Sequence, residues 1–81
     1  MNQQLAKLRW RCRRGMKELD VALAGYLDRY YDAASEQERR IFTDLLDLQD
    51  PELYAYIIGR TTPSDAALAD VIRKLRAAAH P

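Results

Sequence analysis

The sequence predicts an all-α protein, a small single-domain bundle of about five short helices. The chain has 81 residues, which leaves room for one domain and no second core. Apolar residues recur along most of it at the spacings of a helix with one buried face. No segment alternates with a period of two over more than a few positions, so strands are not expected. Residues 1–81 are therefore predicted to form a single helical domain.

Gly15 separates the first two predicted helices. Leu5, Leu8 and Cys12 are spaced i, i+3, i+7 and predict a helix from about Gln3 to Arg13. A longer one-sided stripe predicts a second helix that ends near residues 32–34. The members of this stripe are Met16, Leu19, Leu23, Tyr26, Leu27 and Tyr30.

Start signals mark the remaining three helices. Ser35 and Glu38 have the spacing of a capping box, in which each side chain bonds the other residue's backbone amide. The pair Asp50–Pro51 supplies an N-cap and a first-turn proline, and Gly59 is a natural left-handed stop. Residues 62–65 open the last helix. The apolar faces behind these starts are Ile41, Phe42, Leu45 and Leu48, then Leu53 and Ile57, then Leu68, Val71, Ile72 and Leu75.

The composition excludes several classes of protein. The longest uncharged stretch of any apolarity, Leu53–Gly59, is far shorter than the roughly 20 residues that cross a bilayer, so no membrane insertion is expected. The one cysteine, Cys12, forbids an intrachain disulfide and a cysteine-based zinc site, and suits a reducing, cytoplasmic compartment.

The net charge of +1 is an average over segments of opposite sign. Residues 1–17 hold six basic and no acidic side chains, residues 18–56 hold ten acidic and three basic, and residues 57–81 hold four basic and two acidic. This split can hold the first helix against acidic helices, or it can steer a partner with an acidic surface. Nucleic-acid binding by the basic first helix, with Trp10 stacking on a base, is a third reading. The acidic middle of so small a domain argues against it.

The sequence contains no arrangement typical of catalysis. The one histidine, His80, is next to last, where chains usually fray. Cys12 continues an apolar stripe and suits the core better than a nucleophile, although its arginine-rich surroundings would lower the pKa of an exposed thiol. Glycine-rich phosphate loops, paired carboxylates and metal-ligand spacings are absent. We therefore predict a protein that is not an enzyme, with no catalytic residues, metal site or stable cofactor site of its own.

Core packing and helix caps leave the stretch around Gly15 unexplained. The glycine can simply end the first helix, or it can let another backbone approach closely beside an arginine that makes bidentate contacts. If the helix instead continues through this stretch, Arg14 and Glu18 stand at i, i+4 and form an exposed ion pair.

This stretch resembles the bacterial family of succinate dehydrogenase flavin-assembly factors. The hallmark of that family is Arg-Gly-x-x-Glu, matched here by Arg14, Gly15 and Glu18. Flanking support comes from Leu45-Leu46-Asp47 and from Asp50-Pro51-Glu52-Leu53, and the resemblance runs from about Trp10 to Ile72.

The resemblance implies a five-helix domain that helps attach FAD covalently to the flavoprotein subunit of succinate dehydrogenase, and in some bacteria of fumarate reductase. It also implies that the flavoprotein's own histidine is the nucleophile, while the helper binds that subunit and holds it in a competent arrangement. Arg14, Gly15 and Glu18 would lie on the contact surface. Because arginine is enriched at interface hot spots, we expect Arg14 to be the energetic anchor. Neighbouring contacts would come from Trp10, Arg13, Met16, Asp20 and Tyr56, the last standing where the family often has a tryptophan.

The alternative interpretation is a regulatory, antitoxin-like or nucleic-acid-binding module that uses the basic first helix. The oligomeric state does not follow from the sequence. Adjacent Tyr30 and Tyr31 cannot both face one core, so we expect one of them at the surface.

Overall fold

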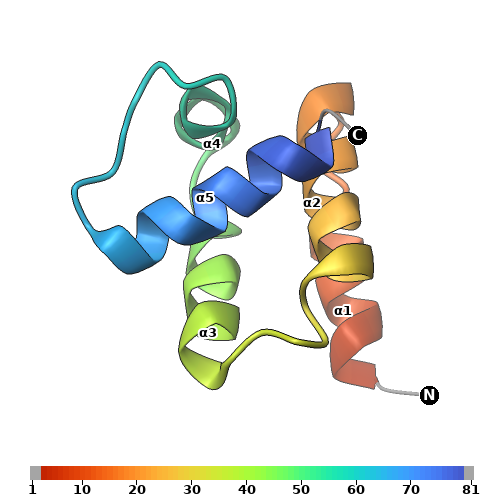
Figure 1. Cartoon of the computed structure of the whole chain (residues 1–81). Helices are drawn as coiled ribbons and strands as arrows, with labels where there is room; N and C mark the ends of the chain where they lie inside the picture. Colours follow the sequence, from red (N-terminus) through yellow and green to blue (C-terminus); the bar gives the residue numbers. More distant parts are fainter. Residues whose placement is uncertain (1–2, 80–81) are drawn as a thin grey trace.

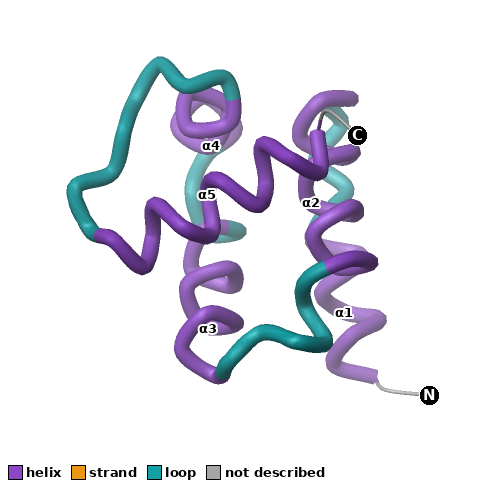
Figure 2. Tube along the Cα trace, viewed as in Figure 1, coloured by secondary structure: helices purple, strands orange, loops and turns teal. Residues whose placement is uncertain are grey.

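Five helices and four connections make up the part of the chain that the structure describes, residues 3–79 of a computed structural model. In chain order the helices are α1 (Gln3–Arg11), α2 (Lys17–Arg29), α3 (Glu36–Leu45), α4 (Asp50–Ile57) and α5 (Ala66–Ala79). No strand occurs among these residues, so the predicted all-α class is confirmed (Figure 2). His80 lies outside the described residues.

The helices end earlier than the apolar stripes suggested. α1 stops at Arg11, and α2 stops at Arg29. Gly15 and Gly59 both take the left-handed conformation, with φ of +87° and +82°, which a residue with a side chain adopts only with strain. Gly59 therefore ends the α4 segment as predicted, whereas Gly15 sits within the α1–α2 turn, beyond the last helical residue of α1.

Two of the predicted helix starts need correction. The Ser35 hydroxyl accepts a hydrogen bond from the Glu38 amide at 3.1 Å, but the Glu38 carboxylate does not return to Ser35. It is occupied by side chains of two other helices. At α4 the extended residue Gln49 is the N-cap, and Asp50 is the first helical residue. The Asp50 carboxylate does not cap the helix and instead accepts a hydrogen bond from an arginine of the α1–α2 turn.

The predicted apolar stripes form the core. In Figure 1, α5 runs diagonally across the view, with α3 and α4 towards one side and α1 and α2 towards the other. The two sides are packed together, since α2 contacts α4 and its Tyr26 ring stacks on Phe42 of α3 with centroids 4.4 Å apart. α5 packs most extensively against α2. The fully buried side chains come from four helices and are led by Tyr26, Phe42, Leu19, Leu23, Leu53, Ile57, Ile72, Leu75 and Val71.

The crossing of α2 and α5 is close because Gly25 lies in it. A Cβ atom placed on Gly25 would come within 2.8 Å of the Ala78 Cβ, which is closer than real Cβ atoms approach. The small side chains at both positions therefore let the two backbones meet, and this sets the position of α5 over α2.

Adjacent Tyr30 and Tyr31 are both partly buried, so the expectation of one exposed ring was wrong. α2 ends at Arg29, and the chain then turns, which frees the second ring from the helical register. Tyr30 lies against Tyr26, with ring centroids 5.8 Å apart, while Tyr31 lies under the Arg39 guanidinium at 4.6 Å.

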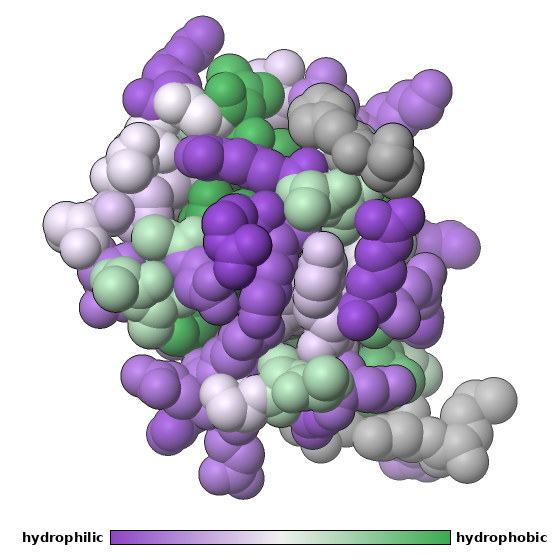
Figure 3. Space-filling model, viewed as in Figure 1, coloured by the Kyte–Doolittle hydropathy of each residue, from purple (hydrophilic) through white to green (hydrophobic). Residues whose placement is uncertain are grey.

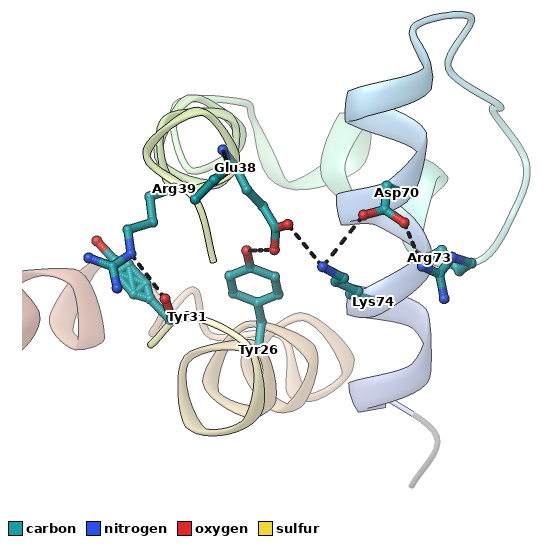
Figure 4. Close-up of polar contacts among 8 residues, drawn as sticks. Tyr26, Tyr31, Glu38, Arg39, Asp70, Arg73 and Lys74 are labelled. Atoms are coloured by element: carbon teal, nitrogen blue, oxygen red, sulfur yellow. Dashed lines mark hydrogen bonds and ion pairs between the residues drawn. The ribbon is translucent and has the colours of Figure 1, made fainter. Parts of the chain in front are cut away.

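A polar network joins α2, α3 and α5 beside the core (Figure 4). The Tyr26 hydroxyl donates to Glu38 Oε2 at 2.6 Å, and Lys74 Nζ donates to Glu38 Oε1 at 2.9 Å. Burial by itself would raise the pKa of Glu38, but these two hydrogen bonds outweigh it and the pKa lies below its ordinary value. The hydrogen bond to Glu38 also raises the pKa of Lys74. Both groups therefore stay charged in the folded protein.

Candidate partner-binding surface

The α1–α2 turn, residues 12–16, is shaped by backbone hydrogen bonds and one carboxylate. Arg13 N donates to Trp10 O at 3.1 Å, and Arg14 N donates to Asp20 Oδ1 at 2.7 Å. Gly15 then reverses the chain direction with its positive φ. Because the helical path is broken here, the i, i+4 ion pair between Arg14 and Glu18 does not form.

Arg14 instead clamps this turn to the corner between α3 and α4. Its Nε bonds Asp50 Oδ1 at 2.6 Å, its NH1 donates to Leu46 O at 2.7 Å, and its NH2 donates to Leu48 O. All three guanidinium nitrogens thus have partners within the chain, and only 13% of the side chain is exposed. We name the contacts of Arg14 with Asp50, Leu46 and Leu48 the arginine clamp. Its guanidinium is therefore occupied internally.

The residues beside Arg14 face outward. Arg13, Gly15 and Glu18 are exposed, Met16 is partly buried, and Trp10 is 73% exposed. A Cβ on Gly15 would meet no atom within 4 Å, so the space over this glycine is open. The arginine clamp holds the backbone of the turn against the protein, and the solvent-facing side of the turn is left open to a partner.

A hollow of about 570 Å³ opens beside Gly15. Its wall includes the Asp20 side chain, which the Arg14 amide holds in place. The remaining lining is Arg9, Cys12, Arg13, Gly15, Ala24 and Leu27. The turn therefore borders a concave, mixed-polarity surface that suits a protruding loop or side chain of a partner.

Tyr56 does not belong to this surface. It lines a different hollow, between α3, α4 and the start of α5, which shares no lining residue with the hollow beside Gly15. The structure thus groups Trp10, Arg13, Gly15, Met16, Glu18 and Asp20 along one turn and its flanking helices, and places Tyr56 elsewhere. Whether any of them touches a partner remains a prediction.

Cys12 is 3% exposed and belongs to the core, as its spacing predicted. Burial raises the pKa of its thiol to about 11, and the opposing effect of Arg9, Arg11 and Arg14 does not overcome it. Within residues 3–79, no group of three or more His, Cys, Asp or Glu side chains is placed to hold a metal ion. Likewise, no helix in this range is long and apolar enough to cross a membrane.

The basic N-terminal segment helps to hold α1 against the acidic middle of the chain. Arg9 pairs with Asp28 and Arg11 with Asp47, each at 2.6 Å, which ties α1 to the acidic middle of the chain. These pairs are exposed, so each stabilises the fold by only about 0–1 kcal/mol. Arg13 is exposed and forms no ion pair within the described part of the chain, so it is available to an acidic partner surface.

Sequence reasoning missed the partners of Arg14. Asp50 lies 36 residues away, and the Leu46 and Leu48 carbonyls lie 32 and 34 residues away. The sequence did hold one indication that Arg14 has a distant acidic partner: an arginine outside a helix and next to a glycine has no neighbour at helical spacing to neutralise it. Nothing local, however, singles out Asp50 among the acidic residues.

The structure defines a small helical protein without a catalytic or metal-binding cluster among its described residues, in which five helices hold one clamped turn beside an open hollow. Comparison with known proteins then places it more narrowly. The family described as the flavinator of succinate dehydrogenase matches residues 6–79, and the chain belongs to that family.

Its relatives include three bacterial proteins named FAD assembly factor SdhE. The one from Coxiella burnetii is 41% identical over 94% of this chain and 95% of its own. The one from Idiomarina loihiensis is 43% identical over 83% of this chain and 74% of its own. The one from Methylococcus capsulatus is 49% identical over 91% of this chain and 89% of its own.

Proposed function

We propose that this chain is an FAD assembly factor, which promotes covalent attachment of FAD to the flavoprotein subunit of succinate dehydrogenase by binding that subunit. Membership in the flavinator family supports this role. The single observation that supports docking at this turn is that Gly15 faces open space while the arginine clamp holds the turn against the protein. A fumarate reductase flavoprotein would be a second client of the same surface.

The proposed mechanism is selection of one arrangement of the partner. A protein that binds only one conformation of a mobile flavoprotein raises the population of that conformation by its differential affinity. A rigid turn suits this task, because little conformational entropy is lost when it docks. The factor supplies no catalytic group in this proposal and holds no FAD of its own, and it acts in the cytoplasm.

The nucleic-acid alternative gains no support from the structure. Arg9, Arg11 and Arg14 are paired with aspartates of the same chain, so much of the basic segment is already neutralised. Phosphate binding would have to break these pairs or rely on the few cations left. Titration with duplex DNA and RNA at physiological salt tests this, and we expect no saturable binding.

The experiment that tests the proposal compares Gly15→Arg with Gly15→Ala. Both variants place a side chain on a backbone with φ of +87°, so both bear the same strain of about 1–2 kcal/mol. Neither Cβ clashes within the chain. Only the arginine projects bulk into the docking surface. We expect Gly15→Ala to retain most binding to the purified flavoprotein, and Gly15→Arg to lose it with helicity preserved.

Covalent flavin in a strain lacking the chromosomal copy gives the functional readout. Gly15→Ala should restore fluorescence of the flavoprotein band in a denaturing gel, and Gly15→Arg should not. Equal binding and equal flavinylation by the two variants would show that the turn is not the docking surface. Failure of the unaltered chain to restore covalent flavin would refute the assembly-factor role itself.

A further inference from the structure

A second hollow, of about 320 Å³, lies between α3, α4 and the beginning of α5. Its apolar lining consists of one buried side chain, Leu45, and four partly buried ones, Ile41, Leu48, Tyr56 and Leu68. Solvent therefore reaches an apolar surface that residues 3–79 leave without an internal partner. Its size suits one large side chain with its neighbours rather than a whole cofactor.

Two carboxylates stand at the rim of this hollow. Asp44 and Asp65 are exposed, and no lysine or arginine belongs to the lining. Neither aspartate takes part in an ion pair within residues 3–79. Asp65 Oδ2 accepts the Leu68 amide at 2.8 Å, which caps α5 and fixes the carboxylate at the rim. We name this hollow with its rim, Ile41, Asp44, Leu45, Leu48, Tyr56, Asp65 and Leu68, the acidic groove.

The acidic groove is distinct from the Gly15 surface. The two hollows have no residue in common, and their charges differ: Arg9, Arg13 and Asp20 line the first, and only aspartates contribute charge to the second. A cationic segment therefore suits the acidic groove better than the hollow beside Gly15. Binding at the acidic groove therefore does not depend on whether the flavoprotein docks at Gly15.

We propose that the acidic groove binds a segment of a partner protein in which an apolar side chain is flanked by lysine or arginine. The apolar side chain fills the hollow, and the cations meet Asp44 and Asp65. Charge complementarity selects this occupant, because the two rim carboxylates repel an anionic segment and lose hydration without compensation beneath a purely apolar one. The apolar floor supplies the affinity, while the rim sets the register and orientation.

Short fluorescein-labelled peptides test the proposal. The probes carry a central leucine or tryptophan flanked by lysines, and the control peptides carry glutamates in place of the lysines. Binding to the full chain is followed by fluorescence anisotropy, and the site by amide chemical-shift changes. We expect saturable binding of the lysine peptides alone, with the largest shifts at Ile41, Leu45 and Leu68, and weaker binding at high salt.

Two variants locate the contact. Asp44→Asn with Asp65→Asn removes both rim charges and keeps a good N-cap for α5, and should weaken lysine-peptide binding about 3- to 10-fold, as expected for two exposed ion pairs. Leu68→Ala should weaken it about tenfold by shortening the apolar wall. The matched control, Asp32→Asn with Glu52→Gln, removes two exposed carboxylates that do not line the groove and should leave binding unchanged.

Several outcomes would overturn the proposal. Absence of binding by every lysine peptide would do so, as would equal binding of the glutamate peptides or equal loss in the Asp32→Asn/Glu52→Gln control. The chain also has an exposed Trp10 within its basic segment, so a second copy is the competing occupant. Self-association in sedimentation velocity that Asp44→Asn/Asp65→Asn abolishes would replace the partner segment by that second copy.

Discussion

Replacing Arg14 with alanine is expected to destabilise the whole domain, because the arginine clamp is an internal structure. The substitution removes an ion pair to Asp50 and two hydrogen bonds to the Leu46 and Leu48 carbonyls. Hydrogen bonds to charged groups each contribute about 1.5–3 kcal/mol. Their sum overstates the loss, since Asp50 is 35% exposed and water solvates it once the arginine is gone. We expect a net loss of about 3 kcal/mol in the free energy of unfolding.

That loss is large for a chain of this size. At about 0.05–0.15 kcal/mol per residue, 81 residues give a stability of about 4–12 kcal/mol. A loss of 3 kcal/mol then lowers the melting temperature by about 12–24 °C, at about 4–8 °C per kcal/mol for a small domain. Arg14→Lys keeps the charge but has no planar fork to reach both carbonyls, so it should recover only part of the loss.

Urea unfolding followed by circular dichroism at 222 nm measures these differences directly. Arg13→Ala is the matched control, since the neighbouring arginine is exposed and should change stability by less than about 0.5 kcal/mol. A double-mutant cycle with Asp50→Asn isolates the ion pair and should show coupling of about 1 kcal/mol or more. If Arg14→Ala unfolds like the unaltered chain yet no longer binds the flavoprotein, Arg14 acts on the partner directly and the clamp reasoning is wrong.

Three further predictions concern the core and the polar network. Gly25→Ala should lower stability by about 1–2 kcal/mol, because the overlap with Ala78 outweighs the gain in helix propensity; the thermal melt should recover in part when Ala78→Gly is added, and a stabilised single variant would contradict this. Because the hydrogen bonds from Tyr26 and Lys74 lower the pKa of Glu38, the stability that they contribute is complete above the ordinary carboxyl pKa of about 4.5 and is lost as the pH falls through the lower folded value. Between about pH 5 and pH 3, the free energy of unfolding measured in urea should therefore fall more steeply for the unaltered chain than for Glu38→Gln. Parallel pH curves for the two proteins would exclude a stabilising role for the Glu38 carboxylate. Cys12, with its pKa raised to about 11 by burial, should react with a thiol reagent at neutral pH only as fast as the domain opens; rapid reaction under native conditions would show an exposed thiolate.

Local signals along the chain predicted most of the secondary structure. The apolar stripe that begins at Met16 identified α2, because a helix with one buried face has apolar residues at a spacing that no other secondary structure shares. Ser35 and Gly59 marked helix ends because each acts locally: the Ser35 hydroxyl accepts the amide three residues on, and Gly59 takes a left-handed conformation itself. The errors fell where a local signal competed with a distant one. Asp50 looks like an N-cap, but Arg14 binds its carboxylate.

The sequence by itself determined that this is a small helical protein of the flavin-assembly family, with an Arg-Gly turn as its most distinctive feature. Only the tertiary structure decided where each member of that turn lies and which groups it contacts. It placed the Arg14 guanidinium inside, against groups more than 30 residues away, and left Gly15 facing open space. It also placed Tyr56 away from the turn, and it brought the Glu38 carboxylate into hydrogen bonds with Tyr26 and Lys74. The physical reason is that caps and periodicity act along the chain, whereas a side chain's distant partners depend on how the helices cross, here through the close contact of Gly25 with Ala78.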